Sequence, residues 1–251
     1  GWLQKRWPTV EPILRRTLGP LEVRFTEKSG AGRTLARAAA EEGASLVVAI
    51  GGDGTASEVG GGLLEFQAQS ANSEPTVGLG YIPCATGGDL RRTLGTSKDI
   101  EEAVESIKNS KGRLIDAGRL EYTGHDGKPG QSYFVNIASA GIGGVVDEIV
   151  NQGGKPLGGS IAFFMASLRA NFRYKNTAVR IRLDDKPAYE ETIQLLAVCN
   201  GQYFGGGMHA APEAKIDDGL FDVLSFGDFS LLESLGIGLP LYRGKHLDRK
   251  K

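Results

Sequence analysis

Residues 46–64, LVVAI-GGDGT-ASEVGGGLL, decide the fold of the first half of the chain. The opening run LVVAI is apolar throughout, which is typical of a parallel strand that is buried on both faces. Glycines then stand at 51, 52 and 54 before a helical pattern begins. The stretch therefore predicts a strand, a tight turn and a helix that covers roughly 55–64.

Outward from this stretch, strand and helix patterns alternate. They predict further strands at 21–26 and 76–82 and further helices at 33–42 and 100–107. Such alternation favours an α/β fold with a parallel sheet and helices on its faces. We expect this α/β domain to occupy residues 1–112.

The second half is expected to be β-rich. Strand patterns recur at 114–122, 133–138, 177–183, 189–199 and 220–226, with one long helical stripe through 161–172. We expect a β-rich second domain at 113–230, followed by the start of a further segment at 231–251.

Composition narrows the function classes. The formal net charge of the 251 residues is -1, so bulk electrostatics do not favour nucleic-acid binding. No apolar run is long enough to span a bilayer, and no secretory signal is visible. The two cysteines, Cys84 and Cys199, lie in or beside apolar stretches and imply no disulfide framework. A reducing, cytoplasmic location is therefore expected.

The turn at 51–55 has the composition of a phosphate-binding loop. Glycines let backbone N–H groups approach an anion, and the following helix adds a favourable dipole. Asp53 indicates a cation or proton transfer, because a carboxylate beside phosphate is otherwise repelled. Thr55 can cap the helix or bind phosphate, and Glu58 follows one turn later. A purely structural interpretation stays open, in which Asp53 only caps a tight turn.

A second turn of similar composition follows the strand predicted at 76–82. It reads PCATGGDL over residues 83–90. Parallel strands bring both turns to the same carboxyl edge, where ligands bind in open α/β sheets. Together, the two turns indicate a nucleotide site.

These segments resemble the diacylglycerol kinase catalytic-domain superfamily, most closely its soluble bacterial lipid kinases. The resemblance is carried by GGDGT at 51–55 with Glu58, IPCATGGDLRRTLG at 82–95, YFVNIASAGIGG at 133–144 and NGQYFGGGMHAAPEAKIDDGLFDV at 200–223. It implies a fold like that of NAD kinases and diacylglycerol kinases, with ATP and Mg²⁺ as cofactors. The residues it implies for the nucleotide are Thr26, Gly51, Gly52, Asp53, Gly54, Thr55, Glu58 and Thr86.

The same resemblance implies a Mg²⁺ site and a reaction. Lys215 and Leu220 would contribute carbonyl oxygens to Mg²⁺, and Asp218 its carboxylate. The family's Asp-Gly-Glu motif, expected to carry the general base, would follow Lys251, and its Asn-Pro-x-x-Gly opening would precede Gly1. We therefore expect a chain trimmed at both ends, in which Asp53 is the best remaining catalytic candidate.

The expected activity is transfer of the ATP γ-phosphate to a lipid alcohol at a membrane surface, with diacylglycerol as the default acceptor. A peripheral location at the membrane follows, and a homodimer is left open. The stripe at 161–172 could offer an apolar wall to a lipid, although such a stripe is more often core. His209 is left out of the catalytic set.

Two alternatives stay open. NAD kinases and phosphofructokinases also carry a GGDG turn, so the acceptor could be a soluble molecule. The chain could also be a non-catalytic nucleotide- or lipid-sensing module. Ala85 and Gly88, which stand where the family usually has glycine and asparagine, are the support for that second alternative.

Overall fold

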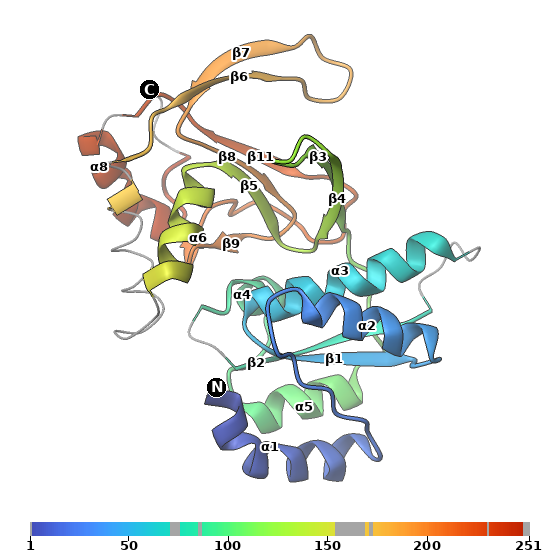
Figure 1. Cartoon of the computed structure of the whole chain (residues 1–251). Helices are drawn as coiled ribbons and strands as arrows, with labels where there is room; N and C mark the ends of the chain where they lie inside the picture. Colours follow the sequence, from blue (N-terminus) through green and yellow to red (C-terminus); the bar gives the residue numbers. More distant parts are fainter. Residues whose placement is uncertain are drawn as a thin grey trace. The chain divides into compact units, whose positions relative to one another are not determined.

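A computed structural model describes residues 2–70, 76–84, 87–153, 169–170, 173–229 and 231–247. The chain divides into two compact units, Gly1–Val135 and Asn136–Lys251 (Figure 1). This division falls later than the domain boundary expected at residue 112. The difference arises because a β-hairpin, 118–134, packs against the helix Asp53–Gln69 of the first unit. The Arg33 guanidinium, from the helix Ala31–Glu41, also donates to Ser132 Oγ of this hairpin over 2.7 Å.

The first unit has the α/β order that the sequence predicts. Its elements are α1 (Trp2–Leu18), α2 (Ala31–Glu41), β1 (Leu46–Gly51), α3 (Asp53–Gln69), β2 (Gly78–Pro83), α4 (Asp89–Leu94), α5 (Ile100–Asn109), β3 (Gly118–Thr123) and β4 (Pro129–Phe134). β1 and β2 are parallel, with Leu46 opposite Gly78 and Gly51 opposite Pro83. The two glycine-rich turns therefore leave the sheet at the same edge, as predicted.

Helices cover both faces of this small sheet. α1 and α5 lie on one side and α2 and α3 on the other (Figure 1). The core on the α1 and α5 side is apolar and fully enclosed, with Val10, Leu14, Ile82, Ala103 and Val104 as its buried residues. No helix was predicted for α1, which contains Pro8 and Pro12 within its span.

On the other face, α2 and α3 approach each other closely. Gly62 makes this approach possible, since a Cβ on Gly62 would lie 2.2 Å from the Arg33 carbonyl oxygen. A side chain at residue 62 would therefore push the two helices apart. The neighbouring Gly60 faces Val135 instead, where a Cβ would lie 3.3 Å from a methyl group.

The strand predicted at 21–26 is wrong. The segment is extended, but among the described residues it joins no strand ladder. This segment and β1 both line a cavity of about 770 Å³, together with residues of α1 and α2. Paired strands lie only about 4.8 Å apart, which would leave no room for such a cavity between them.

The second unit is β-rich, as predicted. Its elements are β5 (Ile137–Gly141), α6 (Ile142–Gly153), β6 (Thr177–Ile181), β7 (Tyr189–Ile193), β8 (Leu195–Cys199), β9 (Tyr203–Phe204), β10 (Met208–His209), β11 (Asp222–Phe226) and α8 (Leu231–Tyr242). An antiparallel sheet has the order β11-β8-β5, and β6 pairs with β7 in a hairpin. α6 packs on the sheet through Ile142 and Val146, which are buried with Leu195 and Phe226.

Several predicted boundaries change in this unit. The strand expected at 189–199 is two strands, because the Gln194 N–H turns away to donate to the Phe226 carbonyl over 2.8 Å. The strand expected at 133–138 likewise divides between β4 and β5. α6 and α8 were not predicted, and the helical stripe through 161–172 lies almost wholly outside the described residues.

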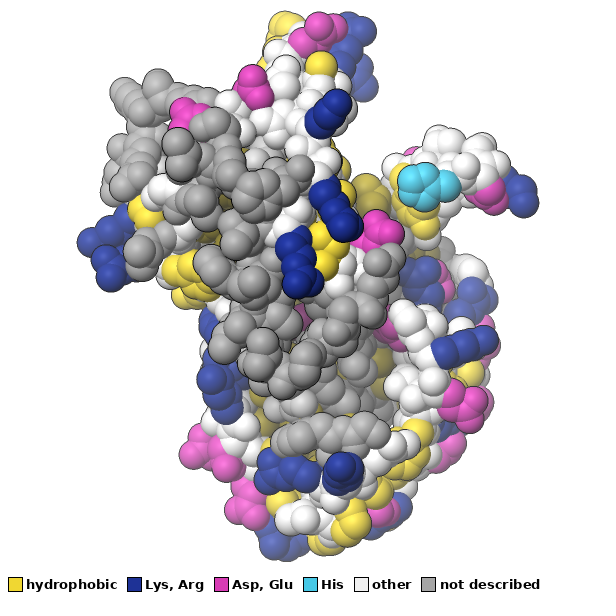
Figure 2. Space-filling model, turned by 60° about the vertical axis from the view of Figure 1, so that its left-hand side comes forward, with side chains coloured by type: hydrophobic (Ala, Val, Ile, Leu, Met, Phe, Trp, Pro, Cys, Tyr) yellow, Lys and Arg dark blue, Asp and Glu magenta, His cyan; other side chains and the backbone are white. Residues whose placement is uncertain are grey.

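The described surface is mixed in charge. On the face drawn in Figure 2, basic and acidic side chains are interspersed, with small groups of hydrophobic side chains between them. This agrees with the net charge of -1. Within the described parts of the chain, we find no helix that has both the length and the apolar character needed to cross a membrane.

Candidate functional site

The turn between β1 and α3 presents open backbone at the start of a long helix. Gly52 is the N-cap of α3, and its carbonyl accepts the Ala56 N–H over 3.1 Å. Gly51 must lack a side chain, because a Cβ there would lie 2.6 Å from Thr55 Oγ1. A Cβ on Gly54 would meet nothing within 4 Å, so this side of the turn is unobstructed. The free N–H groups of the first turn of α3 suit an anion.

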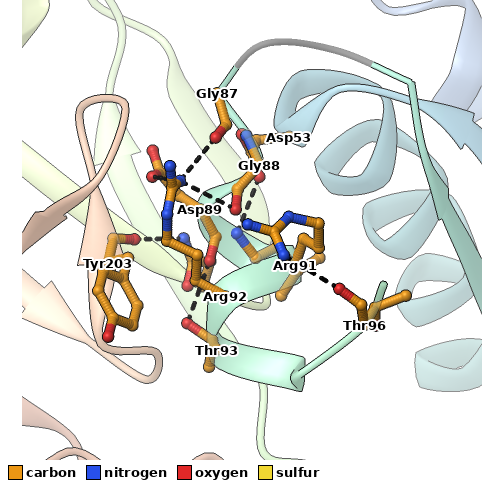
Figure 3. Close-up of polar contacts among 11 residues, drawn as sticks. Asp53, Gly87, Gly88, Asp89, Arg91, Arg92, Thr93, Thr96 and Tyr203 are labelled. Carbon is orange, nitrogen blue, oxygen red and sulfur yellow. Dashed lines mark hydrogen bonds and ion pairs between the residues drawn. The ribbon is translucent and has the colours of Figure 1, made fainter. Parts of the chain in front are cut away.

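Asp53 ties this turn to the second glycine-rich turn (Figure 3). Its Oδ2 accepts the Gly88 N–H and its Oδ1 accepts the Leu90 N–H, each over 2.8 Å. Both donors belong to the first residues of α4, whose N-cap is Gly88. The predicted site residue therefore caps a helix, but the helix is α4 and not its own α3.

The second turn is held from its other side by Arg92 (Figure 3). One guanidinium nitrogen, Nη1, donates to the Gly87 carbonyl over 2.6 Å and to Asp89 Oδ1 over 3.0 Å. Asp89 is 6% exposed, so its charge is largely withdrawn from water and is paired with Arg92. Arg92 was not among the predicted site residues, although a basic residue one turn into the helix that follows this turn is a usable signal.

The substitution at Gly88 is accommodated by the backbone. Gly88 has φ 66°, in the left-handed region that glycine and asparagine tolerate best. The amide of the usual asparagine is absent, and Asp89 is held by the Arg92 guanidinium. The departure from the family pattern therefore preserves the conformation of the turn. Ala85 and Thr86 lie outside the described residues.

Glu58 engages a third segment. Its Oε1 accepts the Gly30 N–H over 2.7 Å and its Oε2 accepts the Gly32 N–H over 2.9 Å. The Ser29 hydroxyl donates more weakly, over 3.4 Å. Gly30 is the N-cap of α2 and has φ 84°. Glu58 thus caps α2 from a neighbouring helix.

Thr26, the other residue expected at the nucleotide, lies near this arrangement. It lines the cavity of the first unit together with Gly32, Ile50 and Thr55. The structure therefore brings Thr26 and Thr55 to one cavity, although they lie far apart in the sequence.

In the second unit, the residues expected to bind Mg²⁺ share one exposed turn. Asp218 Oδ1 accepts the Leu220 N–H over 3.1 Å, and Gly219 has φ 76°. Burial, reinforced by the negative charges of Asp218 and Glu213, raises the pKa of the Asp222 carboxyl. A carboxylate and backbone carbonyls in acidic surroundings fit the preferences of Mg²⁺. Among the described residues, no three His, Cys, Asp or Glu side chains form a metal cluster.

His209 is partly buried and packs against an aromatic ring, which could not be predicted from the sequence. Its ring stacks on Tyr203 with centroids 4.3 Å apart and planes 6° apart. Burial, together with His246, lowers the pKa of His209. The hairpin that joins the two rings contains three glycines with positive φ, at residues 205–207.

Each half of the chain matches a known protein family. Residues 1–120 match the family described as "Diacylglycerol kinase catalytic domain". Residues 136–251 match the one described as "YegS C-terminal NAD kinase beta sandwich-like domain".

Individual relatives agree with these matches. The chain is 36% identical over 219 residues to a "Probable lipid kinase YegS-like" from Chromohalobacter salexigens, covering 86% of this chain and 64% of that protein. It is 31% identical over 204 residues to "Diacylglycerol kinase" from Bacillus subtilis, covering 81% of this chain and 62% of that protein. The chain thus spans less than two thirds of the length of these relatives.

A solved structure shows the same fold. The crystal structure of a diacylglycerol kinase from Bacillus anthracis str. Sterne superposes with a TM-score of 0.66 at 24% identity. The superposition covers 98% of this chain and 74% of that one.

Proposed function

Because the chain belongs to the diacylglycerol kinase catalytic-domain family, we propose that it transfers the γ-phosphate of ATP to the hydroxyl group of a lipid. The observation that carries this proposal is the pair of glycine-rich turns at one edge of the sheet, tied together by Asp53. Such an edge is where open α/β sheets bind phosphorylated ligands.

The backbone of the first unit would hold the nucleotide. N–H groups at Gly51, Gly52, Gly54 and Thr55 would bind phosphate oxygens, and the start of α3 would add its dipole. Thr26 and Thr86 would complete the nucleotide site. A phosphoryl group transferred from such a cradle needs little covalent help from the protein, since positioning and charge stabilisation dominate.

Mg²⁺ would be held by the carboxylate of Asp218 and the carbonyl oxygens of Lys215 and Leu220. When bound, the ion would supply positive charge that offsets the negative charge of phosphate groups. The assignment is supported by the acidic surroundings of this turn.

Asp53 would accept the proton of the attacking hydroxyl. The lipid oxygen would form a bond to the γ-phosphorus as the bond to the ADP oxygen breaks, and the hydroxyl proton would pass to the carboxylate. A carboxylate offers about four lone-pair sites, so the two N–H groups that Asp53 accepts leave room for this step.

The acceptor is proposed to be diacylglycerol, and the reaction is expected at a membrane surface where that lipid resides. One observation supports a second candidate: the family matched by the second unit is described as NAD kinase-like. A soluble acceptor such as NAD is therefore the alternative.

The test is a transfer assay with γ-labelled ATP and Mg²⁺, in which a lipid extract and NAD are offered in parallel. We expect label in the lipid phase, and chromatography of the product identifies the acceptor. Label on NAD would establish the alternative. Label on neither, with ATP still bound, would contradict both kinase proposals and favour a sensing module.

A further inference from the structure

Both carboxylate oxygens of Glu58 accept hydrogen bonds from backbone N–H groups. Each of its carboxylate oxygens accepts one N–H at the start of α2, from Gly30 over 2.7 Å and from Gly32 over 2.9 Å. These are N–H groups of the N-cap and of the second helical residue, which have no partner within their own helix. The negative charge also lies at the positive end of the α2 dipole.

The position of Glu58 on α3 directs it away from Asp53. Glu58 follows Asp53 by five positions, which places the two carboxylates about 140° apart around the helix axis. Asp53 reaches the start of α4, and Glu58 reaches the start of α2. The Glu58 carboxylate is therefore directed at the 29–32 turn and not at the turn that carries Asp53.

The 29–32 turn that Glu58 holds lies beside residues expected to bind the nucleotide. Gly32 lines the same cavity as Thr26 and Thr55. The turn at 29–32 follows Thr26 by only a few residues, so the position of this turn sets the position of Thr26 relative to α3.

We propose that Glu58 is a positioning residue for the nucleotide. It fixes the 29–32 turn, and with it Thr26, beside the Gly51–Thr55 turn, and it does not touch ATP itself. This inference rests on the proposed function, since it concerns the site for MgATP.

Two variants disturb the contact in different ways. Glu58→Gln replaces one acceptor oxygen by an NH₂ group that faces a backbone N–H. Gly32→Ala keeps the charge but adds a methyl group that would lie 2.8 Å from Glu58 Oε2, so the carboxylate must move. The matched control is Glu65→Gln, which removes the same charge from the same helix and weakens an ion pair with Arg33 at 3.3 Å.

Binding of MgATP to the full chain is measured by calorimetry, and folding is checked by thermal melting. We expect the Kd to rise about tenfold in Glu58→Gln, as for one hydrogen bond to a charged group, and to rise similarly in Gly32→Ala. The double variant should be no weaker than the weaker single variant, because both changes act through one contact. Glu65→Gln should stay within about twofold of the original Kd.

The outcomes separate the possibilities. Tighter binding in Glu58→Gln would show that the charge of Glu58 repels the phosphates directly. An unchanged Kd in a folded Glu58→Gln protein would assign Glu58 a purely structural role. Either result overturns the proposal. If Glu58→Gln does not fold, an unchanged Kd in Gly32→Ala overturns it alone. Additive losses in the double variant would also overturn it. Absence of MgATP binding by the unaltered chain would instead overturn the proposed function, and this inference with it.

Discussion

The starts of α2 and α4 are built alike from different sequences. Each begins with a left-handed glycine, Gly30 with φ 84° and Gly88 with φ 66°. At each, both oxygens of one α3 carboxylate accept the N–H groups of the N-cap and of the second helical residue. The carboxylate is Glu58 for α2 and Asp53 for α4.

The two starts differ in where the carboxylate stands. Asp53 lies inside the glycine-rich turn itself, whereas Glu58 lies more than one helical turn further along α3. The same capping geometry can therefore serve two purposes. In the proposed reaction the Asp53 carboxylate would also accept a proton, whereas Glu58 would only hold the backbone of the 29–32 turn.

The largest loss of phosphoryl-transfer activity is expected from Asp53→Asn. The amide can accept only one of the two N–H groups, and it cannot take the proton of the acceptor. Transfer of label should fall by at least about 100-fold, the usual contribution of a general base. The fold should persist, as followed by circular dichroism. Full activity in this variant would remove Asp53 from the reaction and make the two starts functionally equivalent.

Gly62→Ala should disturb the packing of α2 on α3 and leave the start of α4 unchanged. Its methyl group would lie 2.2 Å from the Arg33 carbonyl, so α2 and α3 must separate. We expect a loss of roughly 3 kcal/mol in the free energy of unfolding, as for an overpacked core. Denaturant titration measures it, with Gly144→Ala as the control, since a Cβ there meets nothing within 4 Å. Equal stability of both variants would contradict the close packing of α2 on α3.

The likeness of the two helix starts can be tested with Gly30→Ala and Gly88→Ala. Each alanine must adopt positive φ, which costs about 1–2 kcal/mol. Similar losses of unfolding free energy are expected, with Gly88→Asn closer to the original protein because asparagine tolerates this conformation. A cost at one position only would show that the two starts are not held in the same way.

Tyr81→Phe should have the smallest effect and concerns the Asp53 side. Tyr81 is 5% exposed, and its hydroxyl has no hydrogen-bond partner among the described residues. Burial, and then the charge of Asp53, raise the pKa of Tyr81. Removing an unsatisfied hydroxyl should leave stability unchanged or raise it by about 1 kcal/mol, without loss of transfer. A clear loss of activity would indicate that the hydroxyl supports Asp53 in solution.

Local sequence was sufficient for the centre of the first unit. The apolar run 46–50, the glycines after it and the second turn gave the parallel pair and the edge at which both turns lie. Each of these features is encoded within a few neighbouring residues. The β-rich character of the second unit was also correct, because strand patterns are short-range signals.

What the sequence did not reveal depends on distant partners. Residues 21–26 have a strand pattern, but they pair with no other strand among the described residues. The pattern therefore predicted a strand that the structure does not form. The capping roles of Asp53 and Glu58 join segments 26 to 37 positions apart, and no local motif announces them. Arg92 is a different case, because its partners Gly87 and Asp89 are sequence neighbours and only the fold of the turn brings their oxygens to its guanidinium.

The most direct test of the nucleotide site is hydrogen exchange of the protein with and without MgATP. We expect slower exchange in the segment 51–55, whose N–H groups would bind phosphate. Amides of Gly30 and Gly32, already bonded to Glu58, should change little. Binding of MgATP without protection at 51–55 would contradict the assignment of this turn as the phosphate cradle.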